Sequence, residues 1–533
     1  MLLYAILFVS GASILALELL ASRIMTPYFG VSLYIWTGIL SITLLALALG
    51  YWAGGRLAAR PAGAKSHAAR LLRLYAWMPA IAAAGIVGAC LVYPHTFGAL
   101  ANWSLVAGAF AAALIFLLVP LVATSAMNPL LVALLLEKHA GGDAGAGKVF
   151  FVSTLGSVAG VFATAFVLIP YVSNYTATLI VAGVLAALTV VVVVAAPPGA
   201  AKVAGAGAAG IAALLLCAGM LWQADSYTGR QGPFSYGGVS WRLEASESSL
   251  FGTVKVLKSE EIEAGRFVRM YFHDGLTQNT VDSNNRSVSF YTYALEGLAR
   301  MYGADAKRTL VLGLGAGMVP MRLAERGLKV DVVDIDPVAR RIAAAYFGFD
   351  TARVATHVAD ARTFVGQCRG AYDVAVVDLF HGDGTPEYLV TREFFRDLAR
   401  CLTDGGVAVF NTFADLERPR AYAHLLATLR SELPHLALYR PDAGGSVHVN
   451  SFIVASAKPL REPRRVTFDD VPARHQTALW NMLGGPIPLG SELLEGGRVI
   501  TDAVSAAAHD FADMQLAYRR TVVEGMPSGM LMN

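Results

Sequence analysis

Charged residues are scarce in this chain of 533 residues. Asp, Glu, Lys and Arg together make up 15% of it, whereas about 25% is typical of soluble domains, and 55% of the residues are hydrophobic. This composition excludes a disordered chain, a collagen-like chain and a wholly soluble enzyme. The length also exceeds that of one ordinary domain, so we expect a membrane part and at least one further domain.

Cysteine is equally scarce. Four cysteines are too few for a disulfide framework, and no CxxC pair or Cys/His cluster has the spacing of a metal site. Cys90 and Cys217 lie within apolar runs, whereas Cys368 and Cys401 lie in the more polar C-terminal part. We therefore expect no bound metal and no need for an oxidising compartment.

Charge is unevenly distributed along the chain. Nine Lys or Arg and three Asp or Glu lie in residues 1–222, whereas 33 basic and 36 acidic residues follow. The basic excess lies between apolar runs, which is typical of membrane topology signals rather than of a nucleic-acid surface. The sequence therefore predicts a lipid bilayer as a partner and no nucleic acid.

Long apolar runs dominate the N-terminal part. About 20 residues are needed to cross ~30 Å of hydrocarbon as a helix. Six runs qualify: Met1–Leu20, Leu33–Trp52, Leu74–Tyr93, Phe151–Val172, Ala177–Ala196 and Ala204–Trp222. The first lacks a basic start and a small-residue cleavage site, so we expect a span rather than a signal peptide. The pairs Gly50/Gly54 and Gly156/Gly160 have the GxxxG spacing of closely packed helices.

A seventh apolar stretch, Trp103–Leu136, is too long for one span and short for two. Its 34 residues would form a helix of ~51 Å at about 1.5 Å per residue, and Pro120 and Pro129 interrupt it. A single crossing gives seven spans in total, and a kinked or re-entrant pair gives eight. The sequence leaves both counts open.

From Gln223 on, strand-like and helical segments replace the apolar runs. Residues 232–238 have the composition of a linker, and two strand-like runs follow, Thr253–Leu257 and Phe267–Phe272. Strands then alternate with helices, which is typical of a parallel doubly wound sheet. The expected strands are Thr309–Leu314, Lys329–Val333, Arg353–Val358, Tyr372–Val377, Val407–Phe410 and Val447–Val454.

These segments predict the domain organisation. Residues 1–222 form a multi-span α-helical membrane domain, and residues 223–300 form a linker and a small β region. Residues 301–533 form an α/β Rossmann-like, doubly wound domain with a C-terminal extension.

Acidic residues follow the ends of the expected strands. The turn Gly313-Leu314-Gly315-Ala316-Gly317 follows one strand, and Asp334 lies 21 residues after its first glycine. An acid at this distance can hold ribose hydroxyls in nucleotide-binding folds, and the glycines fit a nucleoside-methionine binder as well as a truncated dinucleotide fingerprint. Asp360 and Asp378 follow the next two strands, and ligands bind at the carboxyl ends of such strands. We therefore favour a functional role for these three acids over helix capping or exposure to solvent. Asp336 precedes a proline at a helix start, so we expect it to cap that helix.

A larger set of motifs occurs in a fixed order. Besides the glycine turn, these are Asp274-Gly275-Leu276-Thr277-Gln278, Val333-Asp334-Ile335-Asp336, Ala359-Asp360-Ala361 and Val377-Asp378-Leu379-Phe380-His381-Gly382-Asp383. Together, over roughly Glu247–Asn411, they resemble the spermidine synthase (polyamine aminopropyltransferase) family. Residues 18–23, 27–30 and 50–56 resemble the membrane-fused spermidine synthase-like proteins.

The resemblance implies a class I methyltransferase-type fold. It also implies transfer of an aminopropyl group from decarboxylated S-adenosylmethionine to putrescine or a related polyamine. The implied donor-binding residues are Gln278, Gly313, Gly315, Gly317, Asp334, Asp360 and Ala361. The implied acid/base is Asp378, and the implied amine-binding residues are Asp274, Tyr291 and Asp383. The chemistry agrees, because a sulfonium carbon is already activated and the enzyme has mainly to position it beside a neutral amine and a carboxylate.

Three departures from the family pattern keep other hypotheses open. Ala316 stands where the family usually has an Asp that holds the donor's tail, Thr292 replaces a His, and the loop after Asp378 carries two extra residues. A second hypothesis is therefore a methyl- or aminocarboxypropyltransferase that uses S-adenosylmethionine itself. A third is a transporter or sensor whose soluble part only binds a nucleoside or polyamine. A homodimer is one option for assembly.

The side of the membrane that the soluble domain faces depends on the number of spans. Basic residues crowd the loop after the second span, which should therefore be cytoplasmic: Arg56, Arg60, Lys65, Arg70 and Arg73. Seven spans then place the soluble domain outside, and eight place it inside. The distribution of basic residues slightly favours seven spans, since Lys138 and Lys148 would then lie in cytoplasmic loops. Nucleoside-sulfonium donors are made in the cytoplasm, and with more weight on this argument we predict a multi-pass cell-membrane protein with a cytoplasmic soluble domain.

Overall fold

The computed structural model describes residues 2–59, 67–138, 144–196, 203–261, 265–380, 384–442, 444, 448–504 and 507–533. The chain forms two compact units. The helical unit comprises Met1–Phe234 and Val523–Asn533, and the soluble unit comprises Ser235–Val522. The division predicted from the sequence does not assign the last residues of the chain to the helical unit. They pack there because Met530, Leu531 and Met532 are apolar side chains that become buried.

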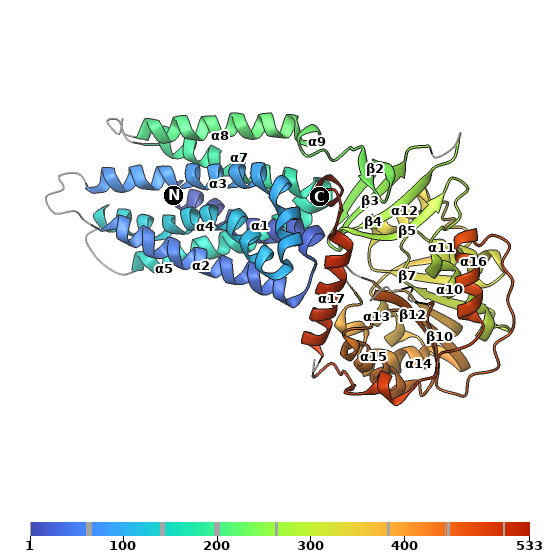
Figure 1. The fold of residues 1–533 in the computed structure, drawn as a ribbon. Helices are drawn as coiled ribbons and strands as arrows, with labels where there is room; N and C mark the ends of the chain where they lie inside the picture. The colour runs from blue at the N-terminus through green and yellow to red at the C-terminus, as the bar shows by residue number, and fades with distance from the viewer. Residues whose placement is uncertain are drawn as a thin grey trace. The chain divides into compact units, whose positions relative to one another are not determined.

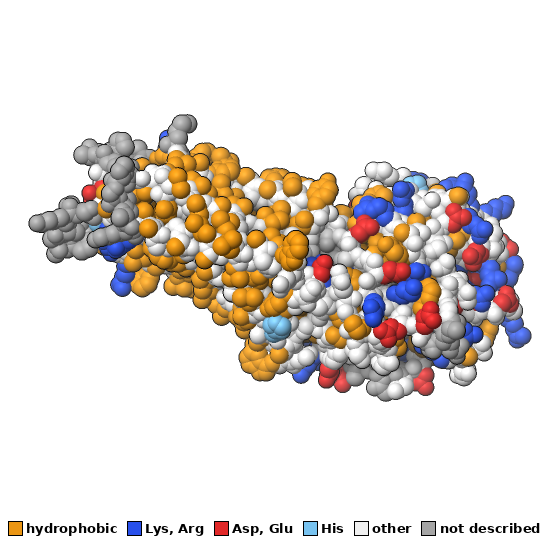
Figure 2. Space-filling view, turned by 90° about the horizontal axis from the view of Figure 1, so that it is seen from above, with side chains coloured by type: hydrophobic (Ala, Val, Ile, Leu, Met, Phe, Trp, Pro, Cys, Tyr) orange, Lys and Arg blue, Asp and Glu red, His pale blue; other side chains and the backbone are white. Residues whose placement is uncertain are grey.

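Seven helices in the described part of the chain are long and apolar enough to cross a membrane. Figure 2 shows hydrophobic side chains gathered over this unit, whereas charged side chains gather on the soluble unit. The helices are α1 (Leu2–Phe29), α2 (Leu33–Ala58), α3 (His67–Trp103), α4 (Leu105–Lys138), α5 (Ala144–Ala163), α7 (Asn174–Val194) and α8 (Ala204–Trp222). A π-helical turn, Thr164–Leu168, and the short α6 (Ile169–Tyr171) extend α5. Because α4 is one continuous helix despite its two prolines, the helices match the seven-span alternative.

Glycine lets pairs of these helices approach closely. A Cβ atom on Gly156 would lie 2.0 Å from the Phe8 carbonyl oxygen, and one on Gly160 would lie 2.1 Å from that of Ala12. α1 and α5 therefore touch backbone to backbone. On α2, a Cβ on Gly54 would lie 2.6 Å from the Ala126 carbonyl oxygen of α4. The close packing predicted from the two GxxxG pairs is confirmed.

The first sheet has five strands, in the order β1-β2-β3-β4-β5, and its strands from β2 to β5, which Figure 1 labels, pair antiparallel. The strands are β1 (Phe234–Tyr236), β2 (Val239–Ser249), β3 (Gly252–Ser259), β4 (Val268–His273) and β5 (Leu276–Asp282). The expected runs Thr253–Leu257 and Phe267–Phe272 correspond to β3 and β4.

The second sheet has seven strands, in the order β11-β12-β10-β9-β6-β7-β8. The strands from β10 to β8 in this order are parallel, whereas β12 pairs antiparallel with both β10 and β11. They are β6 (Arg308–Leu312), β7 (Lys329–Asp334), β8 (Ala355–Val358), β9 (Tyr372–Val377), β10 (Leu402–Asp415), β11 (His435–Tyr439) and β12 (His448–Ser456). The strand order reverses at β6, between β7 on one side and β9 on the other, and ligands bind at such a switch point.

Helices cover both faces of this sheet. One apolar core contains Leu310 and Leu312 with helices α13, α14 and α15, and the other contains Val311 with α10, α11, α12 and α16. These helices are α10 (Phe290–Tyr302), α11 (Met318–Glu325), α12 (Pro337–Tyr346), α13 (Ala361–Gln367), α14 (Arg392–Cys401), α15 (Pro419–Glu432) and α16 (Ala473–Leu483); α17 (Ala508–Val523) and α18 (Ser528–Leu531) follow. The alternation of side chains along β6 produces the two cores.

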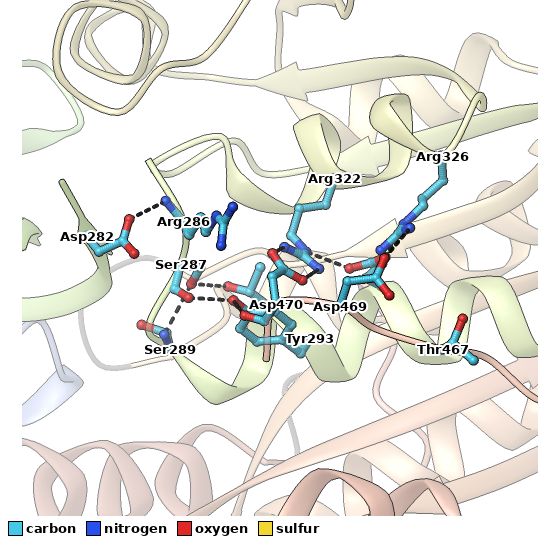
Figure 3. A network of polar contacts seen from close by, with 12 residues as sticks. Asp282, Arg286, Ser287, Ser289, Tyr293, Arg322, Arg326, Thr467, Asp469 and Asp470 are labelled. Carbon is cyan, nitrogen blue, oxygen red and sulfur yellow. Dashed lines mark hydrogen bonds and ion pairs between the residues drawn. The ribbon is translucent and has the colours of Figure 1, made fainter. Parts of the chain in front are cut away.

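A buried ionic network ties the segment before α16 to this framework (Figure 3). The Arg322 guanidinium on α11 donates to both carboxylate oxygens of Asp470, at 2.6 and 2.9 Å, and also to the buried carboxylate of Glu296 on α10. Arg326 donates to the other Glu296 oxygen at 3.2 Å. Breaking such a buried pair costs about 3–5 kcal/mol, so the network holds α10 and α11 in fixed register.

Two cysteines of the soluble unit form a disulfide. Cys368 follows α13 and Cys401 ends α14, and their Cα atoms are 4.8 Å apart. The expectation that these cysteines need no oxidising compartment does not fit this bond. The sequence carries no sign of it, because 33 positions separate the two residues and only the packing of α13 against α14 joins them.

Candidate active site

A cavity of about 360 Å³ opens where β6, β7, β8 and β9 end, and β4 and β5 complete its wall. Eight of the residues predicted for the site line it: Gln278, Tyr291, Gly313, Gly315, Asp334, Asp360, Ala361 and Asp378. They come from both sheets and from the start of α10. The soluble unit therefore gathers most of the predicted set into one space.

Gly313 makes the switch point possible. Its φ of 96° lies in the left-handed region that only glycine adopts without cost. A Cβ at this position would lie 2.1 Å from the Asp378 carbonyl oxygen, and the Asp378 N–H donates to the Leu312 carbonyl at 2.8 Å. Because residue 313 has no side chain, the glycine turn after β6 and Asp378 after β9 can lie next to each other.

Asp334 fixes the glycine turn. Its Oδ2 accepts from the Leu314 N–H and its Oδ1 accepts from the Asp336 N–H, both at 2.8 Å. Burial raises the pKa of this carboxyl, although the two backbone donors oppose that shift. Because each carboxylate oxygen has more than one lone pair, Asp334 can accept further hydrogen bonds from a ligand in the cavity.

Two other acids cap helices. Asp336 Oδ1 accepts from the Val338 N–H at 2.9 Å at the start of α12, so the predicted cap is confirmed. Asp360 Oδ1 accepts from the Thr363 N–H at 2.7 Å at the start of α13. Asp360 therefore combines a capping role with a place in the cavity wall, where the Tyr388 hydroxyl lies 3.4 Å from its Oδ2.

Burial favours the protonated, neutral form of the Asp378 carboxyl. Burial raises its pKa to about 6, and the hydrogen bond from Asn411 opposes the shift. The Asn411 Nδ2 donates to Asp378 Oδ1 at 2.8 Å, and the Asn450 Nδ2 donates to Asn411 Oδ1 at 3.0 Å. A positioned carboxyl with a pKa near the working pH can accept a proton from a substrate.

Tyr291 is held beside Asp378 by a chain of polar contacts. Its hydroxyl accepts from the Asn279 Nδ2 at 2.9 Å, and burial raises its pKa, with the nearby Asp378 charge adding to the shift. The Ser287 hydroxyl donates to Asn279 Oδ1 at 3.0 Å. The Ser287 carbonyl in turn accepts from Tyr293 at 2.7 Å, which connects the cavity wall to the network in Figure 3.

Three predicted residues are not among the cavity-lining residues. Asp274 has a φ of 45° in the β4–β5 turn, and its Oδ1 accepts from the Thr253 N–H at 2.9 Å. Gly317 is the N-cap residue that precedes α11, and a Cβ there would lie 2.6 Å from the ring of Phe349. Asp383 lies outside the described residues. The structure therefore gives Asp274 and Gly317 roles in turn formation and packing.

Sequence reasoning missed the asparagines that support the site. Asn411 directly follows the expected strand Val407–Phe410, so the rule that singled out Asp378 could have found it. Asn279 and Asn450 carry no comparable signal, because their roles depend on contacts made across strands.

The cavity wall is strongly acidic. The lining residues that the structure describes include Asp334, Asp336, Asp360 and Asp378, together with His273, and no Lys or Arg. Such a wall attracts cationic ligands. Among the described residues, His, Cys, Asp and Glu side chains form no group of three or more that could hold a metal ion.

Several known proteins are similar to the C-terminal part of the chain, which forms this cavity. Residues 288–435 match the model of the spermine/spermidine synthase domain. A polyamine aminopropyltransferase of Vibrio vulnificus is 31% identical over 205 residues, which are 37% of this chain and 67% of that protein. An N-terminal histidine N-methyltransferase of Emericella nidulans is 35% identical over 175 residues, which are 31% of each chain. The crystal structure of a probable spermidine synthase from Corynebacterium glutamicum aligns with a TM-score of 0.39 at 21% identity, over 50% of this chain and 97% of that one.

Proposed function

Since the chain belongs through its soluble part to the spermine/spermidine synthase family, we propose that it is a membrane-bound aminopropyltransferase. It transfers the aminopropyl group of decarboxylated S-adenosylmethionine to a small amine, such as putrescine or a related polyamine. The observation that carries this proposal is the buried carboxyl of Asp378, held by Asn411 at the switch point of the sheet.

The proposed reaction is a displacement at carbon. The lone pair of the amine nitrogen attacks the methylene carbon bound to sulfur, and the C–N bond forms as the C–S bond breaks. The electron pair of the broken bond stays on sulfur, which becomes a neutral thioether. Asp378, with a pKa of about 6, is ionised at neutral pH and accepts the proton that the attacking nitrogen gives up.

The remaining residues position the donor and the acceptor. We assign the donor's ribose hydroxyls to Asp334 and its adenine to Asp360 and Ala361, with Gln278 also in contact with the donor. Gly313 and Gly315 let the backbone approach the nucleoside. Tyr291 and Asp383 are assigned to the amine.

The charge of the cavity favours a decarboxylated donor. Ordinary S-adenosylmethionine carries an α-carboxylate, which would be repelled by the four aspartates and would meet no Lys or Arg among the described lining residues. The decarboxylated donor ends in an ammonium group, which these acids attract.

A methyl- or aminocarboxypropyltransferase that uses S-adenosylmethionine is the second candidate. It is supported by Ala316, which is buried in an apolar cluster with Val254, Val256 and Ile342 and stands where the family pattern usually has an Asp, and by the likeness to the Emericella methyltransferase. A third candidate is a module that binds a nucleoside or polyamine without turnover.

Calorimetric titration of the purified protein with both sulfonium compounds separates the first two candidates. We expect decarboxylated S-adenosylmethionine to bind at least about tenfold more tightly, which corresponds to about 1.4 kcal/mol. Tighter binding of S-adenosylmethionine would favour the second candidate, and binding of neither compound would remove the nucleoside site.

A further inference from the structure

We propose that the soluble unit, and with it the candidate active site, lies on the outer side of the cell membrane. This orientation goes beyond the proposed function and does not depend on it. It rests on three features: the direction of the helices, the end of the helical unit at which basic residues gather, and the disulfide of the soluble unit.

The helical unit has two distinguishable ends, because its seven helices alternate in direction. α1, α3, α5 and α8 begin at one end, where α2, α4 and α7 finish. Contacts at this end include Tyr75 of α3, whose hydroxyl lies 3.4 Å from the Leu3 carbonyl of α1. Lys148 of α5 lies over the ring of Tyr4, 4.9 Å from its centre. We call this the basic end.

The basic end carries nearly all of the positive charge of the helical segments. Of the nine Lys and Arg residues before Gln223, only Arg23 belongs to the opposite end of its helix. The other eight lie in the sequence at the helix ends or connections of the basic end: Arg56, Arg60, Lys65, Arg70, Arg73, Lys138, Lys148 and Lys202. Short loops rich in Lys and Arg stay in the cytoplasm, so the basic end is cytoplasmic.

The chain leaves the helical unit from the opposite end. α8 begins at the basic end and finishes at Trp222, and the residues that follow remain at the far end. The Tyr227 hydroxyl donates to the Leu91 carbonyl in the later part of α3 at 2.7 Å. Arg230 donates to the hydroxyl of Ser173, at the start of α7, at 2.9 Å.

The chain also returns to this far end. The Asn533 carbonyl accepts from the Tyr175 N–H near the start of α7 at 3.2 Å. The Ser528 carbonyl accepts from the hydroxyl of Tyr28, near the end of α1, at 3.4 Å. Both connections to the soluble unit therefore start from the end opposite the basic loops, which places that unit outside the cytoplasm.

The disulfide points to the same side by independent chemistry. Cys368 and Cys401 are bonded in the soluble unit, and disulfides persist in oxidising compartments outside the cytoplasm. This orientation reverses the cytoplasmic placement predicted from the origin of the donor. A donor made in the cytoplasm must then cross the membrane before the site can use it.

Cysteine labelling of the full chain in spheroplasts tests the orientation. Glu462→Cys introduces a thiol at an exposed position of the soluble unit, and Ala59→Cys introduces one at an exposed position of the basic end. With a membrane-impermeant maleimide, we expect Glu462→Cys to react in sealed spheroplasts and Ala59→Cys to react only after lysis. The wild-type chain gives the background, and the reverse pattern would overturn the proposal.

The redox state of the native pair provides a second readout. Thiols are trapped in acid and then alkylated with a maleimide polymer that shifts the band on a gel. Cys90 and Cys217 are free thiols, so we expect the band to shift by two polymer units without reduction and by four after reduction; a shift by four units without reduction in growing cells would contradict the proposal. Neither readout involves donor binding or turnover, so a failure of the proposed function would be seen separately, in the titration of purified protein.

Discussion

Burial gives the Asp378 carboxyl a pKa of about 6, which determines the expected pH dependence of turnover. Below this pH the carboxyl is protonated and cannot accept a proton from the amine. We therefore expect kcat/KM to rise with pH through a limb near pH 6, separate from any limb due to the amine itself. A pH–rate profile without this limb would remove Asp378 as the base.

Substitution of Asn411 should move that limb. The Asn411 Nδ2 donates to the Asp378 carboxylate and lowers its pKa, so Asn411→Ala should shift the acidic limb to higher pH while donor affinity is retained. Asn450→Ala is the matched control, because Asn450 reaches the carboxylate only through Asn411, and its shift should be smaller. Equal profiles for wild type and Asn411→Ala would contradict this positioning role.

Donor affinity should depend on the charge of Asp334. Asp334→Asn keeps the shape of the side chain but weakens the charge-assisted hydrogen bonds to ribose, each worth roughly 1.5–3 kcal/mol. We expect a loss of donor affinity of about 10- to 100-fold, measured by calorimetry. Asp305→Asn, at an exposed carboxylate outside the cavity, should bind the donor like the wild type, and a similar affinity of both variants would remove Asp334 from the site.

At the scale of single elements, the glycine turn after β6 has no room for a side chain at residue 313. Gly313→Ala places a Cβ 2.1 Å from the Asp378 carbonyl oxygen, so the variant must shift β9 or the turn, at a cost of about 1–3 kcal/mol. Gly315→Ala is the matched control, since its φ of 52° is also positive but no atom lies within 4 Å of its Cβ.

We expect chemical denaturation to show a larger loss of unfolding free energy for Gly313→Ala than for Gly315→Ala. The comparison is made on stability and not on turnover, because Gly315 also lines the cavity. Equal destabilisation would mean that backbone conformation, rather than the close approach to Asp378, explains the glycine at residue 313.

Strand ends could be predicted from the sequence because short apolar runs stop at glycine or aspartate. Tyr372–Val377 matches β9 at both ends, and Asp378 lies where that rule places it. The run that forms β11 has no β-branched residue and was not recognised. The motif that contains Asp274 does not reveal that its carboxylate turns back to the β3 backbone, and its assignment to the amine stays a prediction.

At the scale of the whole molecule, two features could not be predicted from the sequence because they depend on packing between residues far apart in the chain. The continuity of α4 gives seven candidate spans among the described residues, and it depends on how the two prolines are accommodated among packed helices. The Cys368–Cys401 bond likewise results from the contact between α13 and α14. Local patterns carry neither piece of information.

The disulfide should contribute to the stability of the soluble unit. Closing a loop with a sequence separation of 33 restricts the unfolded chain by about 3–4 kcal/mol in the chain-entropy model. We expect the Cys368→Ala/Cys401→Ala variant to unfold at lower denaturant concentration. The wild type should approach this variant when a reductant is added, and a midpoint unaffected by either change would show that the bond is not formed in the purified protein.

Turnover by wild type and Asp378→Asn decides whether this chain transfers aminopropyl groups with Asp378 as its base. Purified full-length protein is incubated with decarboxylated S-adenosylmethionine and a panel of small amines, and mass spectrometry quantifies the thioether nucleoside and the extended amine. We expect the wild type to form both products in equal amounts. Asp378→Asn should lose about 10²- to 10⁴-fold in kcat and bind the donor unchanged, which assigns the lost interaction to the transition state. If the wild type binds the donor but extends none of the amines, or if Asp378→Asn retains full kcat, the proposed catalysis is wrong.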